Sequence, residues 1–476
     1  MGASLKVIPG GMEIPIRGET PLLEALRALA VPVPLPCGAR GVCGRCRVRF
    51  LKGAPPPTPK ERELIGEAEI LKGVRLACLC SIKEDAVVLI PQQTTHRVPC
   101  PPMPPPPEKN PAPAHAAAVD VGTSTVYILH GESCLKFWNP QGLWGPDVAS
   151  RIQHALEPQK RRAMAKLLKE QIVEGLRELS FSGTVGVSGN PVMLAILEDD
   201  DLTPLSRFPF SRGKRGFRTK EWQGIKALFL PEIGGFLGAD ALSMLTATLL
   251  SHAPKPYMAM DMGTNTELFL VGKERVLGTS LPAGPAFEGY GISSGSPAVK
   301  GAIYEVEEDL SFKTIEGAPE TGICGSGIIS AVHALKKRGF IDETGLLLIN
   351  PYRLGRVTVK QEDVRALQLA KAAVFAGVKL LLEEARVAPK EVKTLFICGN
   401  FGGAVKEKWL FELGFFPEGF KPQVIYLGNT SLWGALWAVV SGRVRKLMES
   451  LKSDVEVLQL AEREDFQKAY LEGMRL

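Results

Sequence analysis

"AVDVGTSTVYI" (residues 118–128) and "MAMDMGTNTELFL" (residues 258–270) decide the fold of this chain. Each stretch is an apolar strand that ends in an Asp-x-Gly-Thr-x-Thr turn and runs directly into a second strand. Successive N–H groups and hydroxyls at the tip of such a hairpin suit a phosphate group. An aspartate at its base can hold Mg²⁺ through water. Two copies predict a duplicated architecture of two similar lobes that grip a nucleotide from both sides.

The residues expected to bind the nucleotide follow from these two turns, because neither a GxxxxGK[ST] nor a GxGxxG pattern is present. The first turn provides Asp120, Gly122, Thr123, Ser124 and Thr125, and the second provides Asp261, Gly263, Thr264, Asn265 and Thr266. Strand-like and helical segments alternate after residue 115, which is typical of an α/β domain. We expect lobe I at 116–255 and lobe II at 256–476, with a C-terminal segment that returns.

This pattern resembles the superfamily of actin, sugar kinases, acetate kinase and heat-shock chaperone ATPases. The resemblance implies ATP and Mg²⁺ as cofactors. It also implies an adenosine loop in "FICGNFGGAV" (396–405), with Gly399, Asn400, Gly402 and Gly403 close to the purine and ribose. "GGFLGADALSML" (234–245) and "LGNTSLWGALWAV" (427–439) resemble the two small-residue helices that cross at the hinge between the lobes.

The group that activates water is less clearly marked. By position, Glu232 resembles the catalytic acid of the chaperone ATPases, and Asp240 is its competitor. Each could equally be a cap or a hinge hydrogen bond, and Asp261 is a third candidate carboxylate. The turn "GICGSGII" (322–329) could bind an anion at a helix N-terminus or could serve close packing.

A second kind of site is indicated by "PCGARGVCGRCRV" (residues 36–48), which spaces Cys37, Cys43 and Cys46 as C-x5-C-x2-C. Glycines between them permit the turns that aim N–H groups at sulfur. A zinc site more often shows two C-x2-C pairs, and only one is present, which favours a [2Fe-2S] cluster. The stretch resembles the adrenodoxin-like branch of the [2Fe-2S] ferredoxins. That resemblance implies Cys78, in "RLACLC", as the fourth ligand and Cys80 as a bystander.

The expected order of domains is a small α+β ferredoxin-like (β-grasp) unit at 1–98, a Pro-rich linker at 99–115 and the ATPase. The proline run "PCPPMPPPPEKNPAP" (99–113) favours an extended spacer that reaches up to roughly 45 Å and swings the cluster. Residues 1–98 contain 14 Lys and Arg residues and 9 Asp and Glu residues, and four of the arginines, Arg40, Arg45, Arg47 and Arg49, lie in or beside the cysteine loop. This charge suits docking on an acidic partner.

Bulk composition excludes some classes of protein. The 476 residues are 45% hydrophobic and 23% charged, as in an ordinary globular protein. No run of 18 apolar residues and no secretion signal is present, so we expect a cytoplasmic protein without a membrane segment. A net charge of +6 is too diffuse to indicate nucleic acid.

The whole chain resembles the reductive activators of corrinoid-dependent proteins. The stretches that carry this include "NPQGLWGPDVASRI" (139–152), "PAGPAFEGYGI" (282–292) and "VEVLQLAEREDFQKAYLEGM" (455–474). The resemblance implies that the cluster passes one electron to a corrinoid protein in the Co(II) state, restores Co(I), and is driven by ATP hydrolysis. An upstream electron donor is then required. Longer members insert a further domain before the ATPase, so a homodimer stays open for this chain.

Three rival interpretations remain. A small-molecule kinase with a redox sensor would need a hydroxyl-activating carboxylate that the sequence does not mark clearly. An activator of 2-hydroxyacyl-CoA dehydratases would hold its cluster within the ATPase lobes, which the N-terminal cysteines contradict. A nucleotide-gated binding module that reports on redox state is the non-enzymatic alternative.

Overall fold

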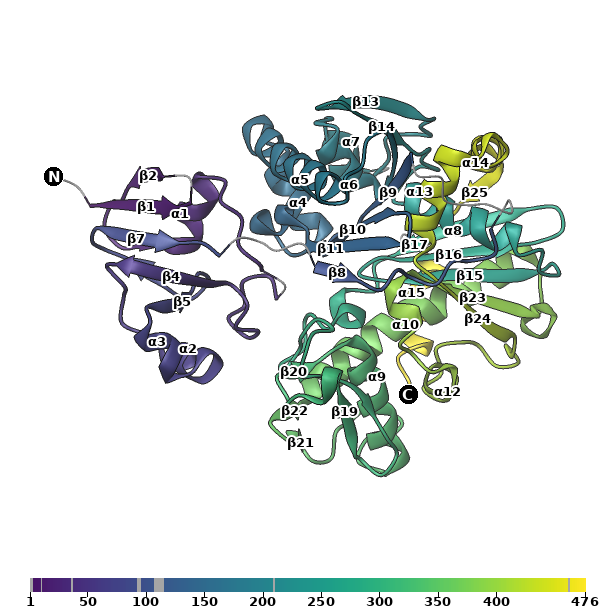
Figure 1. Ribbon diagram of the computed structural model, residues 1–476. Coiled ribbons are helices and arrows are strands. Elements are labelled where there is room, and N and C mark those ends of the chain that lie inside the picture. Colours follow the sequence, from purple (N-terminus) through teal and green to yellow (C-terminus); the bar gives the residue numbers. More distant parts are fainter. Residues whose placement is uncertain are drawn as a thin grey trace.

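The computed structural model describes residues 3–9, 11–35, 37–91, 96–106, 115–208, 210–460 and 463–476, without the side chains of residues 400 and 402. A small N-terminal unit lies beside a larger two-lobed α/β part (Figure 1). This arrangement agrees with the predicted fold class, a small α+β unit followed by two similar α/β lobes.

The N-terminal unit is a five-stranded sheet in the order β2-β1-β7-β4-β5. Helix α1 (Leu22–Ala28) buries Leu22, Leu23 and Leu26, the apolar face of a short amphipathic helix. Thr58 caps the next helix with a full capping box. The remaining elements of the unit are β1 (Ser4–Ile8), β2 (Met12–Pro15), β3 (Thr20–Pro21), β4 (Arg47–Lys52), α2 (Pro59–Ile65), α3 (Glu67–Leu71), β5 (Val74–Leu76), β6 (Ser81–Ile82) and β7 (Ala86–Leu89).

Lobe I is built on a seven-stranded sheet in the order β13-β14-β12-β9-β10-β11-β8. Its central strand β9 (Ala116–Val121) is buried along its whole length, because it lies inside the sheet with helices packed around it. The other elements are β8 (His96–Val98), β10 (Thr125–His130), β11 (Ser133–Trp138), η1 (Pro140–Trp144), α4 (Val148–Ala155), α5 (Pro158–Glu178), β12 (Thr184–Gly189), α6 (Pro191–Leu197), α7 (Thr203–Ser206), β13 (Arg218–Trp222), β14 (Ile225–Phe229) and α8 (Ala239–Leu250).

Lobe II repeats this plan in a six-stranded sheet, β24-β23-β15-β16-β17-β25. Each lobe begins with three antiparallel strands, β9-β10-β11 in lobe I and β15-β16-β17 in lobe II. Two parallel strands then continue each sheet beside the first of the three, β12 and β14 beside β9, and β23 and β24 beside β15. The two lobes therefore share one plan, as the two similar turns predict. Its main elements are β15 (Tyr257–Met262), β16 (Thr266–Val271), β17 (Val276–Leu281), η2 (Pro285–Glu288), α10 (Gln361–Ala385), η4 (Pro389–Glu391), β23 (Thr394–Cys398), α11 (Gly399–Gly402), α12 (Glu407–Glu412), β24 (Gln423–Gly428), β25 (Val455–Val457) and α15 (Glu464–Glu472).

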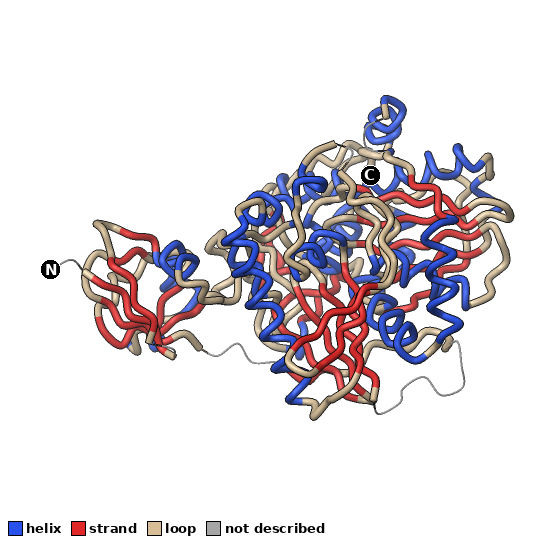
Figure 2. Tube along the Cα trace, turned by 90° about the horizontal axis from the view of Figure 1, so that it is seen from above, coloured by secondary structure: helices blue, strands red, loops and turns tan. Residues whose placement is uncertain are grey.

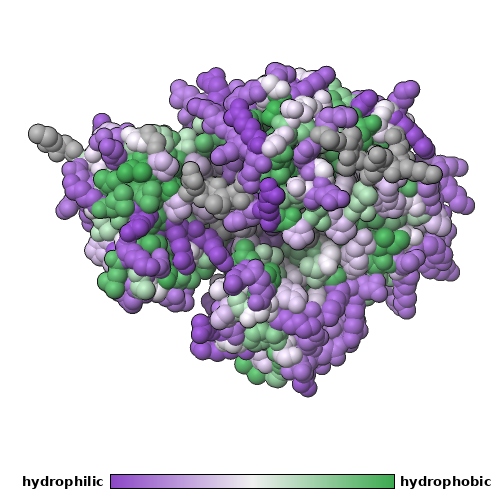
Figure 3. Space-filling view, viewed as in Figure 1, coloured by the Kyte–Doolittle hydropathy of each residue, from purple (hydrophilic) through white to green (hydrophobic). Residues whose placement is uncertain are grey.

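Lobe II also carries two small sheets around one helix, below the main body in Figure 1. These elements are β18 (Ala302–Val306), β19 (Phe312–Thr314), η3 (Ile315–Gly317), β20 (Gly322–Ile323), α9 (Gly325–Lys337), β21 (Tyr352–Leu354) and β22 (Val357–Val359). In the space-filling view a notch separates this part from the N-terminal unit (Figure 3).

The two predicted small-residue helices, α8 and α13 (Thr430–Val440), pack against each other at close range. A Cβ atom at Gly434 would lie 2.5 Å from the Cβ of Ser243, so only glycine permits this approach. Although it lies near the C-terminus, α13 packs on β9 and β12 of lobe I. Helix α14 (Gly442–Asp454) follows it there, and β25 then returns to β17 of lobe II.

The proline-rich segment does not join the N-terminal unit to the ATPase, which corrects the expected spacer and its boundary at residue 98. β8 pairs with β11, and both β8 and β9 belong to the sheet of lobe I. Between them, the Trp433 indole donates to the Pro101 carbonyl oxygen at 3.2 Å. Pro101 and Pro102 of the segment thus lie against α13 and the end of β24 in the ATPase, and residues 90–95 separate β7 from β8 in the sequence.

The N-terminal unit projects from one end of the molecule when seen from above (Figure 2). It contacts lobe I where Arg27 Nε donates to the Leu143 carbonyl oxygen at 2.7 Å. Gly38, on the cysteine loop, faces the ring of Pro146 so closely that an added Cβ would lie 2.6 Å from it. Among the described residues, no helix is long and apolar enough to span a membrane.

Candidate functional site

The two Asp-x-Gly-Thr-x-Thr turns face each other across one cleft of about 230 Å³. The cleft is lined by residues of both turns, by three further acidic side chains and by the starts of α11 and α13: Asp120, Gly122, Thr123, Ser124, Thr125, Val148, Asn190, Asp240, Asp261, Met262, Gly263, Thr264, Asn265, Glu267, Glu288, Gly399, Phe401, Asn429 and Ser431. Residues from distant parts of the sequence therefore meet as the duplicated turns predict.

The first turn is held in shape by its own backbone and by two asparagines. Gly122 N–H donates to the Thr125 carbonyl oxygen at 3.0 Å, and a Cβ at Gly122 would lie 2.7 Å from that oxygen. Asn139 Nδ2 donates to the Gly122 carbonyl oxygen at 2.8 Å, and Asn190 Nδ2 donates to Thr123 Oγ1 at 3.1 Å. Fixed in this way, the turn presents its groups without reordering when an anion binds.

Asp120, at the base of the first turn, is held by the start of α13. Ser431 Oγ donates to Asp120 Oδ1 at 2.7 Å, and Asn429 Nδ2 donates to Oδ2 at 2.8 Å. Burial raises the pKa of this carboxyl, and the two hydrogen bonds oppose that rise. Sequence reasoning placed residues 427–439 on a hinge helix and missed that Asn429 and Ser431 orient the aspartate.

In the second turn, Gly263, Thr264 and Asn265 line the cleft, whereas Thr266 does not. Thr266 is fully buried as the first residue of β16, and its Oγ1 has no hydrogen-bond partner within the described part of the chain. Its predicted part in phosphate binding is therefore not supported. Asp261 faces Gly399, where an added Cβ would lie 2.1 Å from Asp261 Oδ1, so the glycine makes room for the carboxylate.

Several carboxylates of the cleft repel one another. Burial, together with the charges of Asp120 and Asp261, raises the pKa of Asp240 to about 8. Burial and the charges of Asp120 and Glu288 raise the pKa of Asp261 to about 7, and burial also raises the pKa of Glu267. Mg²⁺ is usually held by one or two carboxylates together with water and phosphate oxygens, and the cleft offers carboxylate oxygens of this kind although no three acidic side chains of the described residues surround a single point.

The expected adenosine loop is the short helix α11, directly after β23. Gly399 and Phe401 line the cleft. Gly403 is exposed and faces open space, so the structure does not bring it to the cleft lining. The side chains of Asn400 and Gly402 lie outside the described residues.

Glu288, at the end of η2, is a further cleft residue that sequence reasoning missed. Its Oε1 accepts hydrogen bonds from Thr264 N–H at 3.0 Å and from Thr264 Oγ1 at 2.7 Å. Its Oε2 accepts one from Ser124 Oγ at 2.7 Å. One carboxylate thus bridges the two turns. The only signal in the sequence was an acidic residue among the small residues of "PAGPAFEGYGI".

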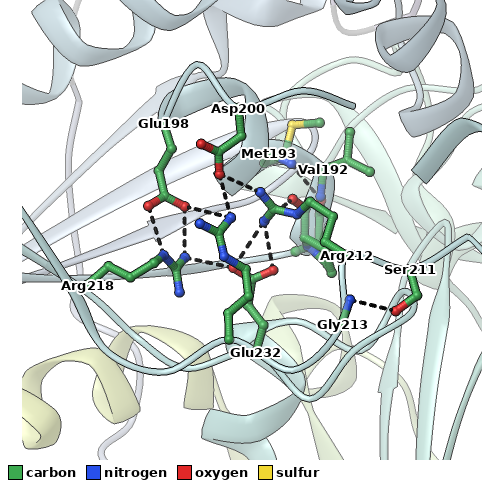
Figure 4. Close-up of polar contacts among 12 residues, drawn as sticks. Val192, Met193, Glu198, Asp200, Ser211, Arg212, Gly213, Arg218 and Glu232 are labelled. Carbon is green, nitrogen blue, oxygen red and sulfur yellow. Dashed lines mark hydrogen bonds and ion pairs between the residues drawn. The ribbon is translucent and has the colours of Figure 1, made fainter. Parts of the chain in front are cut away.

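Glu232 lies outside the lining of the cleft, in a cluster of ion pairs (Figure 4). Both of its oxygens accept from Arg212 Nη2, at 3.1 and 2.8 Å, and Oε1 also accepts from Arg218 Nη2 at 2.7 Å. Arg218 in turn forms a two-pronged pair with Glu198. A carboxylate that is 2% exposed and held by two arginines is not available to activate water. The structure therefore argues against Glu232 as the catalytic acid, and Asp240 is the candidate that lines the cleft.

The four cysteines of the predicted cluster lie around one loop as two pairs. Cys46 and Cys78 sulfurs are 3.2 Å apart. Cys37 and Cys43 also contact each other, and the hydrogen bond from Cys43 lowers the pKa of the Cys37 thiol to about 5. No three His, Cys, Asp or Glu side chains in the described ranges surround a single point. Two pairs of thiols fit a two-iron cluster, in which each iron takes two protein sulfurs.

Neighbouring residues shape this loop. Arg40 Nε donates to the Cys37 carbonyl oxygen at 2.9 Å, and Arg47 Nε donates to that of Gly44 at 3.0 Å. Buried Glu61 accepts from Leu76 N–H at 2.8 Å and so fixes the chain just before Cys78. Hence two of the arginines expected to form a docking face also serve the fold of the loop.

Cys80 lies apart from the four-thiol group as a buried side chain. Burial raises the pKa of its thiol to about 12. It stays a bystander in our interpretation.

The glycines of "GICGSGII" serve close packing. A Cβ at Gly325 would lie 1.8 Å from the Phe287 carbonyl oxygen, and one at Gly327 would lie 2.1 Å from that of Ile303. The start of α9 is thus pressed against η2 and β18, which supports the packing alternative over an anion site.

Three family descriptions match consecutive parts of the chain. Residues 6–83 match "2Fe-2S iron-sulfur cluster binding domain", residues 115–253 match "RACo middle region", and residues 255–476 match "C-terminal domain of RACo the ASKHA domain".

Named relatives and a solved structure extend this likeness. "Corrinoid activation enzyme RamQ" of Eubacterium limosum is 25% identical in an alignment 420 residues long that covers 75% of this chain and 70% of RamQ. The Co(II) methylated amine-specific corrinoid protein reductase of Methanosarcina barkeri is 26% identical in an alignment 415 residues long that covers 75% of this chain and 76% of that protein. The solved "Reductive activator for corrinoid,iron-sulfur protein" is 22% identical with a TM-score of 0.68, covers 100% of this chain and 98% of its own, and shows the same fold. With its cysteine loop, its duplicated turns and all three domains in this order, the chain belongs to the RACo family of reductive activators.

Proposed function

We propose that this protein uses ATP hydrolysis to transfer one electron from a [2Fe-2S] cluster to a corrinoid protein, converting Co(II) to Co(I). The observation that carries the proposal is that the cysteine loop docks on lobe I next to the nucleotide cleft. Gly38 packs on Pro146 of lobe I, and one small cavity is lined by both Leu35 and the phosphate-turn residue Ser124. An electron carrier and a nucleotide site this close can influence each other.

The coupling has a thermodynamic reason. Moving one electron against an unfavourable potential costs about 2.3 kcal/mol per 100 mV. Reduction to Co(I) is uphill for an ordinary ferredoxin cluster, so the transfer needs a second source of free energy. ATP can supply it only if the nucleotide changes which state of the partner the activator binds best.

Each group of residues has a role in this proposal. Cys37, Cys43, Cys46 and Cys78 would hold the cluster, which supplies one-electron chemistry when bound. Asp120 and Asp261 would hold Mg²⁺ through water, and the two turns would bind the phosphates. Asp240, at the start of α8 with a carboxyl that titrates near neutral pH, would orient and deprotonate the attacking water.

The proposed function also implies an upstream electron donor and a cytoplasmic location. Four clustered thiols that act as metal ligands suit a reducing compartment. We infer no more about the donor than that it reduces a surface-docked cluster, and we leave a homodimer as a hypothesis.

The test combines the cluster-loaded protein, a reductant, MgATP and a corrinoid protein poised at Co(II), under anaerobic conditions. We expect the Co(I) absorbance band to grow only with ATP. Asp120→Asn should retain the cluster spectrum and lose this growth, whereas Cys78→Ser should lose both. Equal Co(I) formation with and without nucleotide would refute the activator, and a phosphorylated small molecule formed without Co(I) would support the kinase instead.

A further inference from the structure

The segment Pro285–Tyr290 contacts the nucleotide cleft at several points and reaches a small cavity that the N-terminal unit also lines. Phe287 stacks on Phe401, which lines the cleft at α11, with ring centroids 5.8 Å apart and planes 24° apart. Glu288 bridges the two phosphate turns through Ser124 and Thr264. Tyr290 lines the small cavity that Leu35 of the N-terminal unit also lines.

The contacts of Glu288 are those that a phosphate group would make. Three donors from the two turns converge on one carboxylate, at 2.7 to 3.0 Å. A phosphate oxygen needs the same N–H and hydroxyl donors and carries the same sign of charge. The two anions cannot share these donors, because like charges at this distance repel. Glu288 and the nucleotide phosphates therefore compete.

Beyond Glu288, the segment leads to the docked cysteine loop. Tyr290 lines one small cavity together with Ser124 of the first turn, Pro146 of lobe I and Leu35, which lies just before the cysteine loop. Arg151 lines the same cavity and is 1% exposed. Arg151 Nε donates to the Gly145 carbonyl oxygen at 3.0 Å, no carboxylate forms an ion pair with this guanidinium within the described residues, and its acidic neighbours are Asp147 and Glu288. A buried cation without an ion-pair partner is costly, so Arg151 offers the displaced carboxylate a favourable place.

We propose that Glu288 occupies the place of a nucleotide phosphate between the turns, and that ATP displaces it, shifts Pro285–Tyr290 and releases the cysteine loop from lobe I. The inference rests on the proposed function, which assigns the two turns to ATP. Glu288 is on this view a positioning residue that reports nucleotide binding to the cluster.

Close packing makes the segment suited to transmit such a shift. A Cβ at Gly289 would lie 2.2 Å from the Ser296 carbonyl oxygen, and the start of α9 presses on the Phe287 carbonyl oxygen in the same way. Tightly packed elements move between discrete arrangements and do not deform gradually. A displaced Glu288 side chain therefore carries Tyr290 with it.

The first test measures the affinity of the full-length, cluster-loaded protein for a non-hydrolysable ATP analogue by calorimetry. Glu288→Gln keeps the size of the side chain but loses its negative charge, and its amide nitrogen cannot accept a hydrogen bond. Because the competing anion is gone, we expect binding to be about tenfold tighter. The matched control, Glu274→Gln, removes an exposed charge elsewhere in lobe II and should leave the affinity unchanged. Unchanged or weaker binding by Glu288→Gln would overturn the inference.

The second test follows hydrogen exchange in residues 37–48, first in the wild-type protein and then in Glu288→Gln. The analogue should increase exchange of this loop, because the loop is released from Pro146. Loss of protection without nucleotide in Glu288→Gln supports the same link. A loop whose exchange does not respond to bound analogue rejects it. ATP-dependent Co(I) formation together with no response of the loop defeats this inference alone, whereas absence of ATP binding defeats the proposed function.

Discussion

Replacement of Ser431 by alanine should shift the pH dependence of ATP hydrolysis. Ser431 Oγ donates one of the two hydrogen bonds that hold the Asp120 carboxylate, at 2.7 Å, and the site is buried. A hydrogen bond to a charged group contributes about 1.5–3 kcal/mol. Since this bond favours the ionised form, its loss raises the pKa of Asp120 by about 1–2 units, at 1.36 kcal/mol per unit. If ATP hydrolysis needs the ionised carboxyl, the rate of the variant should therefore fall at a higher pH than the rate of the wild type when the solution is acidified.

The assay is steady-state ATP hydrolysis between pH 5 and 9 at saturating Mg²⁺, followed by Mg²⁺ titrations at pH 6 and 8. The acid limb of Ser431→Ala should move up by about 1–2 pH units, and its Mg²⁺ requirement should rise about tenfold or more at pH 6. Ser431→Thr, which keeps the hydroxyl, should restore most of the profile. Ser450→Ala, on the outer face of α14, is a control that should behave like the wild type. An acid limb of Ser431→Ala that coincides with the wild type would refute the role of this hydrogen bond.

Three further outcomes are expected. Cys78→Ser should abolish the visible spectrum of the cluster, and Cys80→Ser should retain it; the reverse result would reassign the fourth ligand. Glu232→Gln should lower the free energy of unfolding by about 3–5 kcal/mol in urea titrations, because it breaks a buried ion-pair cluster. ATP hydrolysis per folded molecule should stay nearly unchanged. A variant that is stable but does not hydrolyse ATP would instead support Glu232 as the catalytic acid. Asp240→Asn should lower hydrolysis roughly 100-fold. The pKa of Asp240 in the folded protein is about 8, whereas its ordinary value is 3.8, so ionisation of this carboxyl lowers the stability of the wild type as pH rises between these values. The advantage of Asp240→Asn over the wild type in melting temperature should therefore increase from pH 5 to pH 8. Equal melting temperatures at all pH values would show that the Asp240 carboxyl does not have a raised pKa.

The sequence allowed the fold to be predicted because the deciding signals are local. The two Asp-x-Gly-Thr-x-Thr turns each lie between adjacent strands, so their pattern implied a duplicated lobe, which the matching strand orders of the two sheets bear out. The proline run misled the prediction for a physical reason. Polyproline segments extend equally well in solvent or along a surface, and only pairing of His96–Val98 with β11 shows that both ends lie in lobe I.

Site residues could be predicted where they belong to a local sequence motif, but not where they reach the site only through tertiary contacts. The turn residues that line the cleft occupy the same positions in two copies of one motif. Glu288 and Ser431 reach the cleft only through folding, from η2 and α13, and no local pattern distinguishes them from ordinary polar residues. Glu232 failed for the opposite reason, because its position within a familiar stretch gave no sign of the arginines that surround it.

The path of the chain also limits how an electron can leave the cluster. With β7 ending at Leu89 and β8 starting at His96, seven peptide steps join the cluster unit to lobe I, which reach at most about 24 Å when fully extended. That is about half of the roughly 45 Å expected from a free proline spacer. The cluster unit therefore lacks the reach that a free proline spacer would give it. If the proposed function holds, we expect the corrinoid partner to bind beside lobe I, close to the docked loop, because the short connection keeps the cluster unit near that lobe.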